Sequence, residues 1–298
     1  MILSKGFLFL HKTNPLKIIF RLLTVIFILL IASCSNRLPK VQENNIFRYN
    51  ESAGISSLDP AFSNTYENLW VVNQLFEGLV QLDNDLKVIP SIASDWTISE
   101  DGKIYTFHLR DDVYFHGNKE LEKRIVTADD FIFSFQRIID SKTASPGKWV
   151  FNKVSENGFS APDKHTLVIR LSEIFPPFLG ILTMKYCSVV SPEAVAMYGD
   201  EFRTHPVGTG PFVYHFWVEG EVLAMLQNPD YYLKDEQGNN LPYLQGISVS
   251  FNKDLSGVFL DFLKGKYDML QGAEGNFNEE LLDQGGNLRD MYASDIVF

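Results

Sequence analysis

The protein has 298 residues, of which 45% are apolar and 13% aromatic, and its formal net charge is −11 at pH 7. This apolar content predicts a globular body with a buried core and excludes intrinsic disorder. The acidic balance opposes binding to phosphate backbones, so we expect no nucleic-acid partner.

The N-terminus has the pattern of an export signal. Residues 1–33 carry four basic residues and no acidic one, and Leu22–Ile31 is almost entirely apolar. This apolar core is shorter than the roughly 20 residues of a membrane-spanning helix, and small residues precede Cys34 as they do at a cleavage site. We predict a signal peptide over residues 1–33 and a polar tether over residues 34–45.

The two cysteines are interpreted differently. Cys34 closes an Ile-Ala-Ser-Cys run that resembles the lipobox of bacterial lipoproteins, and this resemblance implies that Cys34 is acylated. Several acyl chains would hold an exported protein on a membrane, whereas one chain alone binds marginally. An ordinary signal with an incidental cysteine is the alternative. Cys187 lies in an apolar stretch and is interpreted as a buried thiol. With Cys34 acylated, Cys187 has no intramolecular partner, so we expect no disulfide framework.

The mature chain opens with a strand, a turn and a helix. Residues 47–50 predict the strand, and Pro60 predicts the turn because it fixes its own φ and restricts the residue before it. An apolar stripe at helical spacing then predicts a helix that ends near Gly78. Glu67 and Glu77 are interpreted as solvated or helix-pairing charges. The stripe consists of Leu69, Val72, Leu75, Phe76 and Leu79.

A β-hairpin is predicted where Asp101-Gly102 separates two half-buried runs, PSIASDW and YTFHLRDDVYF. In the second run, apolar residues alternate with Thr106, His108 and Arg110, so one face of the strand is apolar. His108, on the opposite face, is interpreted as solvated. The apolar face consists of Tyr105, Phe107 and Leu109.

A capped helix follows the hairpin. Thr127 stands three residues before Asp130, which is the spacing of a capping box, and it predicts a helix over residues 128–139. The pair Asp129-Asp130 is interpreted as charge at the start of a helix rather than as a metal or catalytic pair. The apolar residues at helical spacing are Phe131, Phe135 and Ile138.

The PVGTGPF segment at 206–212 predicts a tight bend. Gly208 and Gly210 allow a close backbone approach that a side chain would block. A phosphate-binding loop is the other reading of two glycines around a threonine, but the Walker lysine is absent and a strand, not a helix, follows.

The rest of the chain alternates strand and helix signals. A turn at Glu219-Gly220 predicts a second hairpin. The other predicted elements are strands at 166–171, 212–217 and 222–227, a strand carrying Ile247, Val249 and Phe251, and helices at 192–198 and 255–263 that end at Gly199 and Gly265.

The ordered segments SLDP, FEGL, PSIASDW, YTFHLRDDVYF, TADDFIFSFQR and PVGTGPF resemble the extracellular solute-binding proteins of the peptide and nickel class, which serve ABC importers. The resemblance implies an α/β fold, in which a mixed-sheet lobe of the periplasmic-binding-protein type carries an inserted smaller α/β subdomain. The expected boundaries are 46–81 and 182–269 for the first lobe and 82–181 for the subdomain. Residues 270–298 are expected to begin a second large lobe that is missing, and we interpret the chain as truncated.

The same resemblance implies a ligand-binding segment. Asn64, Thr65 and Tyr66 occupy positions where relatives run an extended backbone beside a bound peptide. Main-chain hydrogen bonds would then recognise any peptide, and pockets would sort side chains loosely. Tyr66 also fits the start of the next helix, and this alternative stays open.

Two further positions are implied as ligand contacts. Relatives carry an aromatic ring near the position of Gly147. Trp149, two residues on, either replaces that ring as a ligand contact or packs in the core, and both accounts stay open. Gly210 is the last implied ligand-binding residue.

The implied function is ligand capture without chemistry and delivery to the permease subunits of an ABC importer. Peptides are the expected ligand, and nickel chelates, haem or short sugars are alternatives. Because the family closes two lobes around its ligand, we expect this chain alone to bind peptide weakly or not at all. The expected location is the periplasmic space or cell surface, as a monomer anchored to a membrane by lipid.

We expect no cofactor, no metal site and no catalytic residue. The histidines are scattered, and neither a His-Glu-x-x-His nor a Gly-x-Ser-x-Gly motif is present. A membrane-tethered hydrolase that uses Asp and His residues brought together by folding, and a lipoprotein with a structural or adhesive role, are the remaining alternatives.

Overall fold

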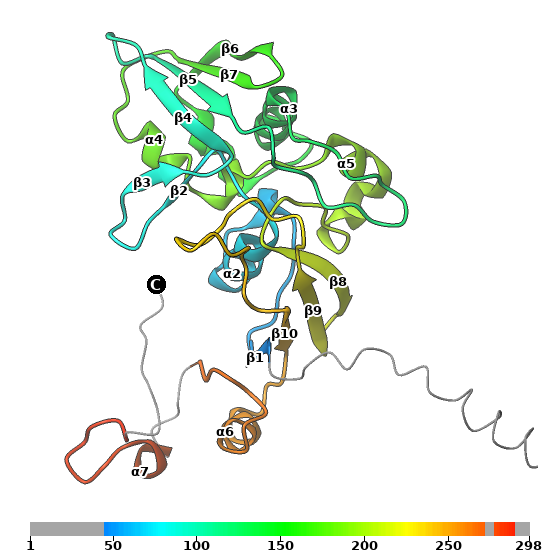
Figure 1. The fold of residues 1–298 in the computed structure, drawn as a ribbon, viewed down its shortest axis with the longest axis vertical. Helices are drawn as coiled ribbons and strands as arrows, with labels where there is room; N and C mark the ends of the chain where they lie inside the picture. Colours follow the sequence, from blue (N-terminus) through cyan, green and yellow to red (C-terminus); the bar gives the residue numbers. More distant parts are fainter. Residues whose placement is uncertain (1–44, 272–276, 290–298) are drawn as a thin grey trace, which may run out of the picture. The chain divides into compact units, whose positions relative to one another are not determined.

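The computed structural model describes residues 45–271 and 277–289. The predicted signal peptide, the predicted lipidation site Cys34 and nearly all of the tether lie outside the described residues. Within the described ranges, two four-stranded sheets and one two-stranded sheet carry the fold (Figure 1). No helix in these ranges has both the length and the apolarity that a membrane span requires.

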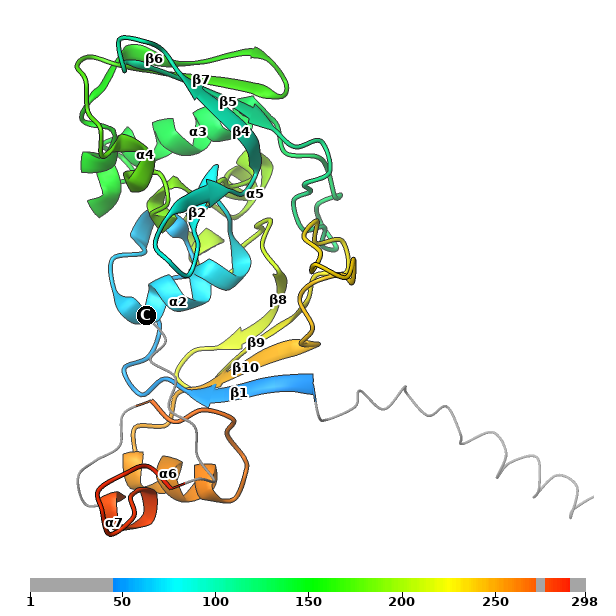
Figure 2. The same cartoon turned by 60° about the vertical axis from the view of Figure 1, so that its left-hand side comes forward.

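The first sheet joins a strand from the start of the described chain to three later strands (Figure 2). β1 (Ile46–Asn50) lies parallel to β10 (Gly246–Ser250), and the sheet continues antiparallel through β9 (Val222–Gln227) to β8 (Phe212–Val218). These elements confirm the predicted strands. The side chains facing the core are apolar and buried, and they include Tyr49, Phe212, Leu223, Met225, Ile247 and Val249.

The second sheet has the order β4 (Ala93–Ile98), β5 (Ile104–Leu109), β7 (Thr166–Leu171) and β6 (Val154–Asp163), and all its pairs are antiparallel. Gly102 adopts φ +67° in the turn between β4 and β5, so the predicted hairpin is confirmed. Its predicted apolar face is also confirmed, because Tyr105, Phe107 and Leu109 are buried.

Helix α3 (Ala128–Ile139) packs on β6 and β7, and its predicted bounds are confirmed. The capping box forms: the Thr127 N–H donates to Asp130 Oδ2 at 2.8 Å, and its hydroxyl donates to the same oxygen at 2.9 Å. The buried Asp130 also accepts two hydrogen bonds from Arg124, at 2.7 and 2.8 Å. It is therefore a structural carboxylate at the helix start.

The remaining elements are short. Gly199 (φ +52°) follows α5 (Pro192–Tyr198) and Gly265 (φ +73°) closes α6 (Leu255–Leu263), as the sequence predicts. Cys187 is buried, which confirms its interpretation as a core thiol, and this burial raises its pKa. The others are η2 (Pro60–Phe62), α2 (Tyr66–Leu75), β2 (Val80–Leu82), β3 (Val88–Pro90), η3 (Pro146–Phe151), α4 (Phe178–Ile181), η4 (Lys185–Cys187), η5 (Gly199–Arg203) and α7 (Asn278–Leu281).

The two large sheets draw on different parts of the chain. Every strand of the second sheet lies between residues 93 and 171, whereas the first sheet uses residues 46–50 and 212–250. The exact limits of the expected lobe and subdomain stay a prediction.

Candidate ligand-binding site

The candidate site lies where the parallel strands β1 and β10 end. Asn50 and Ser250 are paired at the carboxyl ends of these strands. In open α/β sheets, ligands bind in the crevice outside the carboxyl ends of the strands. The chain leaves β1 at this edge and runs through residues 51–65 to the N-terminus of α2. We call residues 63–66 the α2 entry segment.

The side chain of Asn50 fixes the end of this sheet. Its Nδ2 donates to the Asn252 carbonyl at 2.9 Å, and its Oδ1 accepts from the Asn252 N–H at 2.7 Å and from the Ser250 hydroxyl at 2.9 Å. Because the whole amide is engaged and buried, it ties β1 to the loop that follows β10. The edge is therefore held firmly at the point where the site begins.

The charge at this edge is negative. Glu51 is 5% exposed and accepts a hydrogen bond from the Ala53 N–H at 3.1 Å. Burial raises the pKa of Glu51, and the nearby charge of Glu67 raises it further. Glu51 thus precedes the loop that carries the site, Glu67 follows it, and their charges are close enough to interact.

A buried asparagine holds the loop against α2. Asn68 accepts a hydrogen bond from the Ser56 N–H and donates to the Ser56 hydroxyl, both at 3.0 Å. Its amide also donates to the Phe62 carbonyl at 3.4 Å. The segment from Ser56 to Phe62 is therefore fixed, and it presents the α2 entry segment at the surface.

Within the α2 entry segment, the residue just before the helix is extended. Thr65 has φ −116° and ψ 154°, and its hydroxyl caps the helix by accepting from the Asn68 N–H at 3.4 Å. Tyr66 is the first helical residue and is 50% exposed, so its reading as a helix start is confirmed. Among the described residues, the main-chain N–H groups of Thr65 and Tyr66 have no hydrogen-bond partner. These two donors belong to exposed residues, as Asn64 beside them is.

Trp149 lies on η3, which contacts η2 just before the α2 entry segment. The Ser145 hydroxyl links these elements by donating to the Ala61 carbonyl at 2.6 Å. Trp149 is 47% exposed, so the alternative that it packs in the core is wrong. A Cβ on Gly147 would come within 2.4 Å of the Tyr186 ring, so Tyr186 fills the space there. A ligand contact of Trp149 stays a prediction.

Gly210 serves the packing of the bend in this structure. Its N–H donates to the Leu75 carbonyl at 2.9 Å, and its carbonyl accepts from His116 Nε2 at 3.0 Å and from Asn228 Nδ2 at 2.9 Å. A Cβ on Gly210 would come within 2.6 Å of the Gln74 carbonyl. The predicted close approach is confirmed, and no main-chain group of Gly210 is left for the implied ligand contact.

The two histidines His116 and His108 lie in opposite environments, one buried and one solvated. Burial lowers the pKa of His116 to about 4, so its imidazole is neutral and its Nε2–H holds the Gly210 carbonyl. His108 is solvated as predicted, with its Nδ1 2.5 Å from Asp95 Oδ1. Over residues 45–271 and 277–289, no group of three or more His, Cys, Asp and Glu side chains could hold a metal ion.

The interpretation of Glu77 as a solvated or helix-pairing charge is wrong. Helix α2 ends at Leu75, so Glu77 lies beyond the helix and turns inward, where it is 5% exposed. Its Oε1 accepts from the hydroxyls of Tyr231 and Tyr232 at 2.7 and 3.2 Å, and it lines a cavity of about 120 Å³ together with Lys185. The partners are more than 150 residues away, so local spacing gave no signal of this contact.

Burial raises the pKa of Glu77 to about 7, against the opposing effects of Tyr231 and Lys185. The folded protein therefore keeps this proton at pH values where the unfolded chain, with an ordinary pKa of 4.5, has lost it. As the pH rises from about 4.5 to 7, the contribution of this carboxyl to the free energy of unfolding therefore falls.

The Glu77→Gln variant is expected to remove this pH dependence, because glutamine keeps an oxygen acceptor for the tyrosines and carries no charge. We expect the variant to be more stable than the wild type at pH 8 and close to it at pH 5, measured by urea unfolding. Glu122→Gln, at an exposed carboxylate, is the control and should match the wild type at both values. If the variant and the wild type differ in stability by the same amount at pH 5 and at pH 8, the expectation is contradicted.

The comparisons with known proteins agree with this architecture. Residues 87–295 match the family model described as bacterial extracellular solute-binding proteins, family 5 middle. The chain belongs to this family of solute-binding proteins. The predicted α/β fold of the periplasmic-binding-protein type is thereby confirmed.

Individual relatives are matched over part of their length. The Escherichia coli periplasmic murein peptide-binding protein MppA is 30% identical over 245 residues, which are 76% of this chain and 43% of that protein. The probable deoxycholate-binding periplasmic protein YgiS of the same organism is 32% identical over 221 residues, or 68% of this chain and 40% of that protein. The chain thus spans less than half the length of these curated relatives.

A solved structure shares this fold and is likewise matched over part of its length. The Helicobacter pylori periplasmic binding protein DppA in complex with the peptide STSA superposes with a TM-score of 0.71 and 30% sequence identity. The match covers 79% of this chain and 48% of that chain.

Proposed function

We propose that the protein captures peptides as the lipid-anchored substrate-binding component of an ABC importer and hands them, chemically unchanged, to a membrane permease. The family and the two relatives named for peptides support this proposal. The observation that carries it is the exposed part of the α2 entry segment, residues 64–66, with its two free main-chain donors near the carboxyl edge of a parallel strand pair.

An extended peptide suits these groups. Its main-chain carbonyls accept hydrogen bonds from N–H groups whatever its sequence is, which is how strand addition achieves broad specificity. Thr65 already has extended dihedrals, so an accepting strand would need no rearrangement there. The carboxylates of Glu51 and Glu67 would favour a peptide with a positively charged group near this edge.

Deoxycholate is the second candidate ligand, because one relative is named as its probable binding protein. A bile acid is an anion with few hydrogen-bond acceptors for its size. The negative charge of Glu51 and Glu67 opposes an anion at this edge, so the geometry favours a peptide.

Two substitutions at Tyr66 separate its main-chain donor from its ring. Tyr66→Pro removes both, yet proline suits the first position of a helix and an extended residue before it, so α2 should remain intact. Tyr66→Ala removes only the ring. We expect trialanine to shift the backbone amide resonances of residues 64–66, with Tyr66→Pro binding about fivefold more weakly than Tyr66→Ala through loss of one hydrogen bond.

Trialanine and deoxycholate should be titrated in parallel by heteronuclear NMR, which detects weak binding. Equal affinities of the two Tyr66 variants, or trialanine shifts that bypass residues 64–66, would contradict main-chain recognition. Saturable deoxycholate shifts at these residues without trialanine shifts would favour the second candidate.

A further inference from the structure

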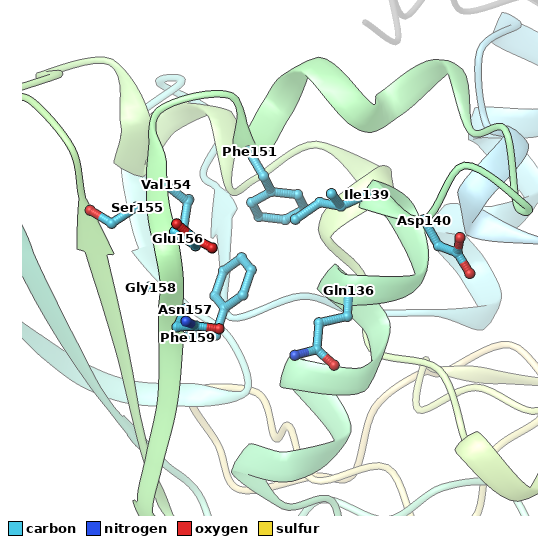
Figure 3. A pocket seen from close by; sticks show the side chains of 10 residues that line it. All are labelled: Gln136, Ile139, Asp140, Phe151, Val154, Ser155, Glu156, Asn157, Gly158 and Phe159. Atoms are coloured by element: carbon cyan, nitrogen blue, oxygen red, sulfur yellow. The ribbon is translucent and has the colours of Figure 1, made fainter.

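A groove of about 440 Å³ lies between helix α3 and strand β6, and the candidate site contributes no residue to it (Figure 3). It exists because β6 bulges. Val154 pairs with Leu171 and Phe159 pairs with Ile169, so β6 advances five residues while β7 advances two. Residues 155–158 of β6 therefore stand against Arg170 alone on β7, and they bend the edge strand and form one wall of the groove.

Two residues of the bulge have backbone conformations or surroundings that few residue types accept. Asn157 has φ +53°, a left-handed conformation that asparagine tolerates better than most residues. A Cβ on Gly158 would come within 2.6 Å of the Arg170 carbonyl, so only glycine lets the bulge return to β7 at this distance. Bulges of this kind re-aim side chains, and here they turn polar groups toward α3.

The floor of the groove is aromatic. The rings of Phe151 and Phe159 lie edge to face, with centroids 5.5 Å apart and planes at 86°. Phe135 supports both rings, at 4.6 Å from Phe151 and 5.5 Å from Phe159. Ile139 adds an aliphatic surface beside them (Figure 3). The floor is therefore rigid, apolar and suited to a ring or a branched alkyl group.

The rim of the groove is polar and acidic. Figure 3 shows Glu156 and Asn157 pointing from β6 toward α3, with Gln136 opposite them. Among the described residues, none of these three side chains has a hydrogen-bond partner. Asp140 lies at the end of α3, and the ten lining residues include no Lys, Arg or His. The basic residue just before the bulge, Lys153, is engaged by Glu173.

We propose that this groove binds a small amphipathic cation, in which an aromatic or branched apolar group carries a primary ammonium. The apolar group would lie against the half-buried Phe159 and Ile139, with the nearly buried ring of Phe151 beneath them. The ammonium would donate to the Glu156 carboxylate and to the amide oxygen of Gln136. The volume lies within the range of small-molecule sites, which combine apolar walls with a few convergent polar groups.

The probe for this site is 2-phenylethylammonium, with 2-phenylethanol and phenylacetate as its neutral and anionic counterparts. Each is titrated into the full chain, and the amide resonances of Gly158 and Phe159 are followed by heteronuclear NMR. We expect saturable shifts with the ammonium, weaker binding of the alcohol and none of the carboxylate. Glu156→Gln should weaken ammonium binding about fivefold, as loss of one charge-assisted hydrogen bond implies.

Glu100→Gln is the matched control, because it removes the same charge from an exposed turn between β4 and β5. It should leave the affinity unchanged. Glu156 is exposed and unpaired among the described residues, so its substitution should leave the other resonances in place. Equal affinity for ammonium and alcohol, equal effects of the two substitutions, or no saturable shift at Gly158 would overturn the proposal. These results are independent of peptide binding at residues 64–66.

Discussion

The Gly208→Ala variant is expected to lose about 3 kcal/mol of stability or more, because the new methyl group would overpack a backbone contact. A Cβ at position 208 would lie 2.0 Å from the Leu75 carbonyl oxygen and 2.9 Å from the Phe76 ring. The same carbonyl accepts from the N–H groups of Thr209 and Gly210, at 3.1 and 2.9 Å. Relief of the clash must therefore break both hydrogen bonds.

The loss at Gly208 should spread to the C-terminal end of α2 and to the segment around residue 116. The Gly208 carbonyl accepts from the His116 N–H at 2.8 Å, and the Thr209 hydroxyl accepts from the Glu77 N–H at 3.3 Å. Movement of the bend therefore loosens the segment around residue 116 and the end of the helix. We expect earlier urea unfolding together with faster amide hydrogen exchange in α2.

Gly180→Ala is the control for this substitution. Gly180 lies in the short helix α4, its φ is not positive, and an added Cβ meets nothing within 4 Å. Alanine there should be neutral or slightly stabilising, since glycine is the poorer helix former. A Gly208→Ala variant that unfolds within about 1 kcal/mol of the wild type would show that the bend can move aside at little cost.

Local patterns were enough to predict most of the elements. The Asp101-Gly102 turn, the capping box of α3 and the glycines that end α5 and α6 act through neighbouring residues, so the sequence predicts them directly. The close backbone approach at Gly208 was also predicted. The PVGTGPF segment lacks the lysine and the helix of a phosphate-binding loop, so its glycines indicate a bend too crowded for side chains.

Features that depend on distant partners could not be predicted in this way. Glu77 meets two tyrosines more than 150 residues later, and Tyr186 fills the space beside Gly147 from a different element. The bulge in β6 depends on how this strand pairs with β7. The sequence of an irregular strand does not show that register. At the candidate site, the position of the α2 entry segment was predicted from the family resemblance, but its free N–H groups became visible only in the structure.

The Arg137→Met variant is expected to lose about 3 to 5 kcal/mol of stability, because it leaves a buried carboxylate without its cation. The guanidinium of Arg137 donates to Asp59 Oδ1 at 2.9 Å and to Oδ2 at 2.5 Å, and the two side chains are 14% and 3% exposed. Asp59 also accepts from the Ala61 N–H at 3.0 Å, so it caps η2. The pair therefore joins α3 to the loop before the candidate site.

The expected loss arises from the charge left on Asp59, so removal of that charge should restore part of the stability. The double variant Asp59→Asn/Arg137→Met keeps an oxygen for the Ala61 N–H and should unfold at higher urea concentration than Arg137→Met alone. Arg203→Met breaks an exposed ion pair with Glu219, 3.0 Å long, and should cost less than about 1 kcal/mol. Equal losses of stability in Arg137→Met and Arg203→Met would contradict the expectation. So would a double variant that is no more stable than Arg137→Met, and the loss would then come from the packing of the Arg137 side chain against Phe202.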